Sequence, residues 1–169
     1  MDQAKRPVTA LAGPYGHPLH PALVPIPIGA WIASFVFDLA SRVVDQPQFL
    51  AEGSRWLIGL GVLGAVAAGC VGLLDLLAIP GGTRAFRTAL VHMSINLTVT
   101  AVYAVGFLLR SGATGPVGVG PLVLSAVALA GLLVGGYLGG HLAYRYGVRV
   151  ADEATQAEGY QSTDTKESV

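Results

Sequence analysis

Four long apolar stretches, separated by short polar segments, dominate the pattern of this 169-residue chain. They cover about residues 26–44, 54–79, 84–110 and 122–146, with few charged positions inside each stretch. An α-helix rises 1.5 Å per residue, so helices of about 20 to 27 residues cross roughly 30 Å of hydrocarbon with some tilt. The pattern therefore predicts four membrane-spanning helices.

Short connections force neighbouring helices to run antiparallel, so the expected fold class is all-α, an up-down four-helix bundle in the membrane. Thr83 follows a Pro-Gly-Gly turn, and we predict that it caps the third helix. Residues 1–150 then form one transmembrane domain. Residues 151–169 are polar and poor in large apolar side chains, which predicts a disordered tail.

The first helix is preceded by a segment rich in proline and histidine, GHPLHPALVPIPIGAW at Gly16–Trp31. Proline lacks an amide hydrogen, so four prolines do not fit together inside one regular helix. Pro27 suits a first turn, and we expect the segment before it to be stiff and largely non-helical. Such backbone is tolerated at membrane depth where protein covers it. We therefore predict a lid that carries His17 and His20; the alternative is an interfacial lead-in with solvated histidines.

Composition supports a membrane protein and excludes several function classes. The chain is 53% hydrophobic and 12% charged, with a mean hydropathy of +0.60, whereas soluble domains have about 25% charged residues. A formal net charge of zero argues against a nucleic-acid partner. We find no secretory signal pattern, so the first apolar stretch should be retained. The single cysteine, Cys70, cannot form an intramolecular disulfide.

Basic residues near the helix ends predict the orientation in the membrane. The end that carries both termini has six of them, and the opposite end has three. The six are Lys5, Arg6, Arg84, Arg87, Arg145 and Arg149, and the three are Arg42, Arg55 and Arg110. Lys and Arg accumulate on the cytoplasmic side, so we expect both termini in the cytoplasm.

All four histidines and one aspartate fall at the end of the bundle that carries the termini. They are His17, His20, His92, His141 and Asp75. An ionisable group at membrane depth is costly unless it faces protein or a cofactor. Within the third helix, a polar stripe recurs every three or four residues and should face inward: His92, Asn96, Thr100 and Tyr103. The alternative is that its last three members only hydrogen-bond neighbouring helices.

Small residues recur every four positions in the second and fourth helices. In the fourth helix they are Gly131, Gly135 and Gly139. Such faces allow close approach between helices. The same faces would also leave room for a flat cofactor, and both interpretations can hold in one helix.

Three segments resemble a family of small bacterial membrane proteins that is classified as a domain of unknown function. They are GHPLHPALVPIPIGAW with the later FDL, LLDLLAIPGGTRA with the histidine and asparagine after it, and GGYLGGHLAYRYGVRV. The resemblance covers about residues 13–150. It implies a four-span domain of the bacterial inner membrane and a redox partner such as a Rieske-type protein. Many members have a histidine where this chain has Pro25, so any role of that histidine is absent here.

The first functional hypothesis is a b-type haem protein in electron transfer. His92 and His141, on consecutive helices at similar depth, are then the axial ligands. Asp75 or Asn96 would hold the second nitrogen of a ligand. Four arginines stand where they would neutralise the haem propionates, although the accumulation of basic residues on the cytoplasmic side explains them equally well. They are Arg84, Arg87, Arg145 and Arg149.

The second hypothesis is a site for a Zn, Fe or Cu ion. Its ligands would be His17, His20, Asp75, His92 and His141. A third is a scaffold subunit without a cofactor. The chain has no phosphate-binding loop, hydrolase or dithiol motif, so we do not expect a stand-alone enzyme. Bilayer lipid is the expected partner, and the sequence leaves open whether the chain forms a homo-oligomer.

Overall fold

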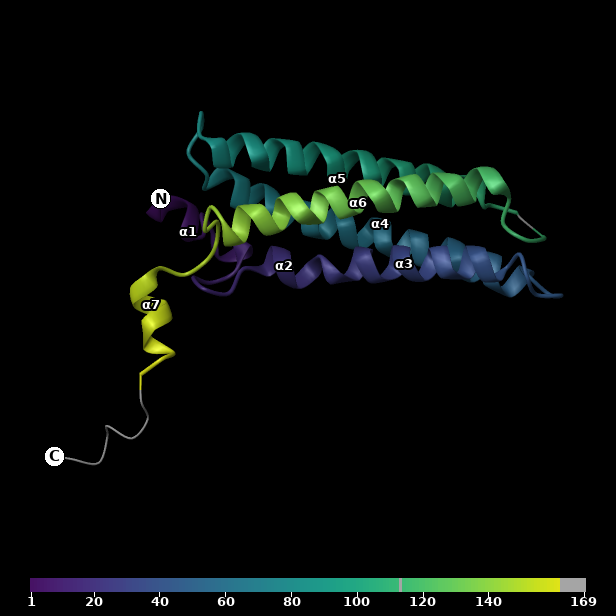
Figure 1. Ribbon diagram of the computed structural model, residues 1–169, viewed down its shortest axis with the longest axis horizontal. Coiled ribbons are helices and arrows are strands. Elements are labelled where there is room, and N and C mark those ends of the chain that lie inside the picture. The colour runs from purple at the N-terminus through teal and green to yellow at the C-terminus, as the bar shows by residue number, and fades with distance from the viewer. Residues whose placement is uncertain (113, 162–169) are drawn as a thin grey trace, which may run out of the picture.

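The computed structural model describes residues 1–112 and 114–161, and four long helices form its body. These are α3 (Pro25–Ala40), α4 (Gln48–Leu77), α5 (Arg84–Leu109) and α6 (Val119–Tyr144), which lie side by side as an up-down bundle (Figure 1). The short helix α2 (Leu19–Leu23) leads into α3, and together they make one span. All four spans are long and apolar enough to cross a membrane. The predicted all-α four-helix membrane bundle is confirmed.

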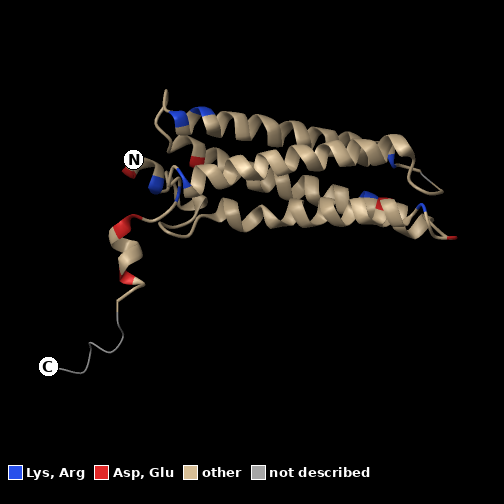
Figure 2. Ribbon diagram, in the orientation of Figure 1, with Lys and Arg blue, Asp and Glu red and all other residues tan. Residues whose placement is uncertain are grey.

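Both ends of the described chain lie at the same end of the bundle (Figure 1). We call it the terminal end, and we call the opposite end, with the connections 41–47 and 110–118, the loop end. Three smaller elements complete the described structure at the terminal end: α1 (Asp2–Lys5), the 3-10 turn η1 (Ala10–Ala12) and α7 (Glu153–Glu158). Lys and Arg residues gather at the two ends and leave the middle of the bundle almost free of charge (Figure 2).

The proline-rich segment before α3 is largely helical, which corrects the expectation of non-helical backbone there. Pro18 is the N-cap of α2 and Pro21 lies in its first turn. Pro25 begins α3, and Pro27 follows in the same turn. Amide groups in a first helical turn have no partner within the helix, so proline is tolerated there. Two successive helix starts thus accommodate four prolines that one continuous helix would exclude.

The predictions for Thr83 and for the C-terminal tail have different outcomes. Thr83 caps α5 as predicted, because its Oγ1 accepts a hydrogen bond from the Phe86 amide at 3.1 Å. The tail predicted to be disordered instead contains α7 in its first part. A local hydrogen bond explains this start, since the Asp152 carboxylate accepts from the Thr155 amide at 2.9 Å. Residues 162–169 of the predicted tail lie outside the described residues.

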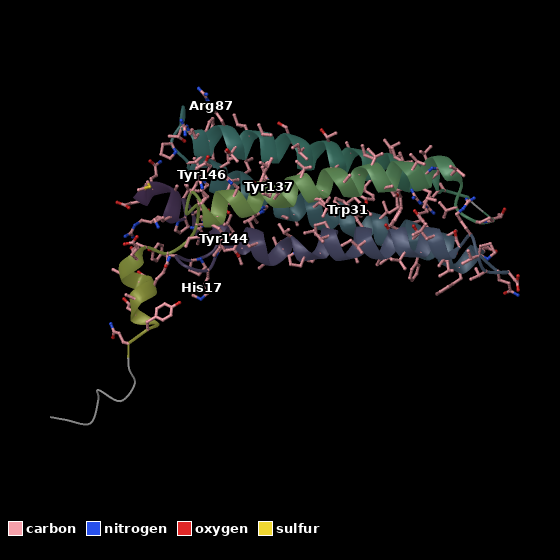
Figure 3. All side chains as sticks on the ribbon, in the orientation of Figure 1. His17, Trp31, Arg87, Tyr137, Tyr144 and Tyr146 are labelled. Carbon is pink, nitrogen blue, oxygen red and sulfur yellow. The ribbon has the colours of Figure 1, made fainter. Side chains whose placement is uncertain are left out.

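Large apolar side chains cover the outside of the bundle. Leu63 and Leu133 are 71% and 76% exposed, as suits a surface in contact with lipid. The centre contains a buried cluster of Trp31, Ile58, Val99, Tyr103 and Ala128. In that cluster the Trp31 and Tyr103 rings stack at a centroid distance of 4.2 Å. Trp31, labelled in Figure 3, lies in the body of the bundle, well away from the terminal end.

Candidate imidazole site

His20 of α2 and His92 of α5 come together near the terminal end of the bundle. Their ring centroids are 6.4 Å apart, and the rings are inclined at 85°. Within residues 1–112 and 114–161, no group of three or more His, Cys, Asp or Glu side chains is placed to hold a metal ion. The structure therefore brings two of the four predicted histidines into one site, as a pair.

Each imidazole of this pair is held by a backbone carbonyl of another helix. His20 Nδ1 lies 2.7 Å from the Ala68 oxygen in α4, and His92 Nδ1 lies 2.8 Å from the Gly135 oxygen in α6. A carbonyl only accepts, so each Nδ1 is the protonated nitrogen and donates. In the neutral imidazole, Nε2 then has the free lone pair. Histidines that ligate metals are typically held in this way, with the second ring nitrogen on a carbonyl or carboxylate.

Glycines in α4 and α6 provide the space that these two rings occupy. A Cβ on Gly72 would lie 2.9 Å from His20 Nδ1, and a Cβ on Gly139 would lie 3.1 Å from His92 Cε1. The predicted small-residue faces therefore receive polar side chains of the same chain at these positions. At these positions the small residues allow close approach between helices, which is one of the two interpretations of these faces.

Asn96 lies one turn beyond His92 and extends the same inward face of α5. Its side-chain amide donates to the His92 carbonyl oxygen at 2.8 Å and lies 3.3 Å from His92 Nδ1. The shorter contact is the hydrogen bond that orients the amide, since Nδ1 itself donates to Gly135. Thr100 follows, with its hydroxyl donating to the Asn96 carbonyl oxygen at 2.8 Å. The predicted polar stripe thus faces inward, and much of its hydrogen bonding stays within α5.

The other predicted ligands lie elsewhere at the terminal end. His17 is exposed there (labelled in Figure 3). His141 lies among aromatic rings, with centroid distances of 4.8 Å to Tyr146 and 6.2 Å to Tyr137. Arg84 and Arg145, predicted to face haem propionates, are both exposed.

Asp75, which the sequence placed among the ligands of a metal ion, has an arginine as its partner. Arg149 Nε lies 2.9 Å from Asp75 Oδ1, and the two residues are 5% and 9% exposed. Arg149 also donates through Nη2 to the carbonyl oxygens of Ala12 and Gly13, at 2.9 and 3.0 Å. Sequence reasoning counted Arg149 as a flanking basic residue and as one of the arginines near the haem propionates. It did not find the ion pair, because nothing in the spacing of Arg149 indicates that the chain turns back over the bundle.

A second buried ion pair, at the loop end, was also missed. Arg110 donates through Nη2 to Asp38, and these residues are 4% and 0% exposed. Ser54 donates to the same carboxylate, and Ser125 Oγ accepts from Arg110 at 2.9 Å. The sequence did contain an indication of this pair. Up-down topology brings the ends of the first and third stretches together, and ionisable residues at membrane depth usually pair.

Near α7, the pKa of the Asp152 carboxyl is lowered to about 2. The main cause is the hydrogen bond from the Thr155 amide, followed by the one from the Tyr15 hydroxyl at 2.8 Å. Asp152 is therefore ionised at neutral pH and joins the chain after α6 to the segment before α2.

These features define a class: a helical four-span membrane protein with a pair of anchored imidazoles near one end of its bundle. The chain belongs to the DUF2231 family, described as predicted membrane proteins, whose family model matches residues 16–152. That match contains all four spans, the imidazole pair and both buried ion pairs. No curated protein and no solved structure matches the chain.

Proposed function

We propose that this protein binds haem b within the membrane and passes single electrons through it, with His20 and His92 as the axial ligands. The observation that carries the proposal is the separation of the two ring centroids, 6.4 Å. Two metal–nitrogen bonds of about 2 Å, together with two ring radii, put the centroids of imidazoles on one metal about 6 Å apart. The observed separation is close to that value.

The number of converging side chains favours haem over a bare ion. A porphyrin supplies four nitrogens in its plane, so the protein needs to add only axial ligands. A structural zinc ion instead takes about four protein ligands. In the part of the chain that the structure describes, His20 and His92 belong to no larger cluster of His, Cys, Asp or Glu. A donor set of two imidazoles fits a haem.

The surroundings of the pair suit this role. The carbonyl groups of Ala68 and Gly135 orient the rings and increase the basicity of each free Nε2. When bound, haem supplies a one-electron redox couple. Arg84 and Arg145 add positive charge at the same end, which favours the propionate carboxylates. The resemblance described above implies a redox partner such as a Rieske-type protein, at the inner membrane of a bacterium.

The test is the absorption spectrum of the purified, detergent-solubilised protein with four single substitutions. We expect a Soret band in the unmodified protein and its loss in His20→Ala and His92→Ala. His17→Ala and His141→Ala are the matched controls and should retain the band, because these rings lie outside the pair.

Three results would contradict the proposal. The first is an unmodified protein, expressed with haem supplied, that has no Soret band. The second is stoichiometric Zn, Fe or Cu without porphyrin, which would assign a metal ion to the site. The third is a band that survives His20→Ala but not His141→Ala, which would make His141 the second ligand.

A further inference from the structure

Arg149 is held in an unusual backbone conformation just after α6. Its φ is +60°, in the left-handed region that residues with a Cβ adopt only at a cost in free energy. Its amide donates to the Ala4 carbonyl oxygen at 2.9 Å, and its side chain is almost fully buried. Strain of this kind persists where several contacts determine one conformation. Arg149 is thus tied both to the N-terminal segment and to α4.

The contacts of Arg149 lead directly to the start of α2. Its guanidinium donates to the carbonyl oxygens of Ala12 and Gly13. Gly13 has a φ of +89°, and a Cβ there would clash with the His17 oxygen and lie 2.9 Å from the Leu19 nitrogen. Gly13 therefore packs against the backbone from which α2 begins, and His20 is the second residue of that helix.

The ion pair with Asp75 connects these contacts of Arg149 to α4. Asp75 follows Gly72 by three residues, so both lie on one face of the helix. Gly72 packs against the His20 ring, and Ala68, one turn earlier, accepts the hydrogen bond from its Nδ1. Arg149 thus joins the backbone that precedes His20 to the helix against which its ring packs.

Further contacts attach the same two segments. We call residues 147–152 the C-terminal strap. Tyr15 donates to the Asp152 carboxylate at 2.8 Å and accepts from the Asp152 amide at 2.8 Å. Lys5 Nζ donates to the Ala151 oxygen at 3.4 Å. The strap therefore holds the N-terminal segment at several points on either side of Gly13.

We propose that Arg149, paired with Asp75, is the positioning residue for the His20 imidazole, and that the C-terminal strap, by fixing the segment before α2, limits the access of water to this imidazole. The proposal deepens the proposed function by naming what regulates access to that site. It rests on the haem assignment only for the identity of the site, because closure by the strap is a property of the chain itself.

The test uses diethyl pyrocarbonate, which acylates accessible imidazoles, on the full chain in detergent, with tandem mass spectrometry to locate the modification. His17 is exposed and serves as the internal reference. We expect His20 to react at least about tenfold more slowly than His17, equivalent to about 1.4 kcal/mol of closing free energy. Arg149→Gln should abolish the difference, whereas Arg42→Gln, an equal loss of charge at an exposed position of the loop end, should preserve it.

The same measurement in a His92→Ala background separates the strap from the haem, because that variant lacks one proposed axial ligand. Protection of His20 that persists there and disappears on adding Arg149→Gln supports the strap, whatever the spectrum shows. Protection already lost with His92→Ala alone would assign it to the cofactor or to the neighbouring His92 ring, and either result would overturn the proposal.

Variants with smaller changes keep the proposal falsifiable if Arg149→Gln does not fold. Arg149→Lys retains the charge but not the planar donor group that reaches two carbonyls, and Asp75→Asn removes the carboxylate charge while it keeps the size and shape of the side chain. Each should increase the His20 reactivity by an intermediate amount. Unchanged protection of His20 in folded Arg149→Gln, or in both milder variants, would overturn the proposal.

Discussion

Asp38 and Asp75 are each buried on an apolar helix, and each is paired with an arginine from a distant part of the chain. A buried ion pair offsets the desolvation of its charges only when further hydrogen bonds satisfy both partners. The loop-end pair meets that condition, since Ser54 donates to Asp38 and Arg110 also donates to Ser125. Removal of one member therefore leaves a buried charge without its counter-ion.

We predict that Asp38→Ala lowers the free energy of unfolding by about 3–5 kcal/mol, because Arg110 is left buried and unpaired. Denaturant titration in detergent, followed by helical circular dichroism, measures the loss. Asp45→Ala is the matched control, an exposed aspartate in the turn after α3, and should change stability by less than about 0.5 kcal/mol. Equal effects of the two substitutions would show that the ion pair contributes no stability.

The depth of these charged residues could be predicted from the sequence, but their partners could not. Counting along the apolar stretches placed Asp75 at the terminal end and Arg110 at the opposite end, and both residues lie there in the structure. The pairing of Asp75 with Arg149 depends on a left-handed residue that turns the chain back over the bundle. No helical periodicity extends into that segment, so spacing could not reveal it.

At the scale of the helices, glycines of α4 set how closely α3 approaches, and of Gly53, Gly61 and Gly64, which all face α3, Gly61 makes the closest contact. Gly61 of α4 lies against the Trp31 indole, and a Cβ there would clash with Nε1. The same indole donates to the Ile58 oxygen at 3.3 Å and stacks on Tyr103. The indole cannot move away without losing these contacts. The four-residue repeat of small residues identified such faces, but it could not show which glycine meets a large side chain.

We predict that Gly61→Ala lowers the free energy of unfolding by about 1–3 kcal/mol, the usual cost of overpacking a core. Gly69→Ala on the same helix is the control, since nothing lies within 4 Å of a Cβ there. It should be neutral or stabilise by up to about 1 kcal/mol, because alanine is the better helix former. Thermal unfolding in one detergent compares the two variants. Equal losses would mean that the Trp31 contact does not limit helix approach.

For the whole molecule, four spans place both termini on one side of the membrane, and basic residues predict which side. The terminal end carries Lys5, Arg6, Arg84, Arg87, Arg145 and Arg149, against Arg42, Arg55 and Arg110 at the loop end. The terminal end has more Lys and Arg residues than the loop end, although one arginine at each end forms a buried ion pair.

We predict that a reporter fused after Val169 is cytoplasmic, because Lys and Arg are retained on that side. Activity of fused green fluorescent protein and of alkaline phosphatase reports the location in bacterial cells. A fusion inserted in the connection 110–118 is the control and should report the opposite side. An inverted pattern at the two sites would reverse the orientation.

The architecture was predictable because it depends on local quantities. The length of each apolar stretch, the short connections and the Thr83 cap are read from neighbouring residues, and the structure confirms the four-helix bundle. Sequence reasoning also grouped His20 and His92 in one site, together with three further ligands. It could not single out these two as a pair, because the contacts of His20 with α4 and of His92 with α6 depend on how the helices pack against one another.

The two buried ion pairs also determine how the fold responds to the membrane potential. Moving one elementary charge through 100 mV involves about 2.3 kcal/mol of electrical work. Each buried guanidinium has its carboxylate beside it, so the pair carries no net charge for the field to displace. Neither the Asp38–Arg110 pair nor the Asp75–Arg149 pair therefore acts as a voltage sensor. We expect both pairs to keep their positions when the cell energises or de-energises its membrane.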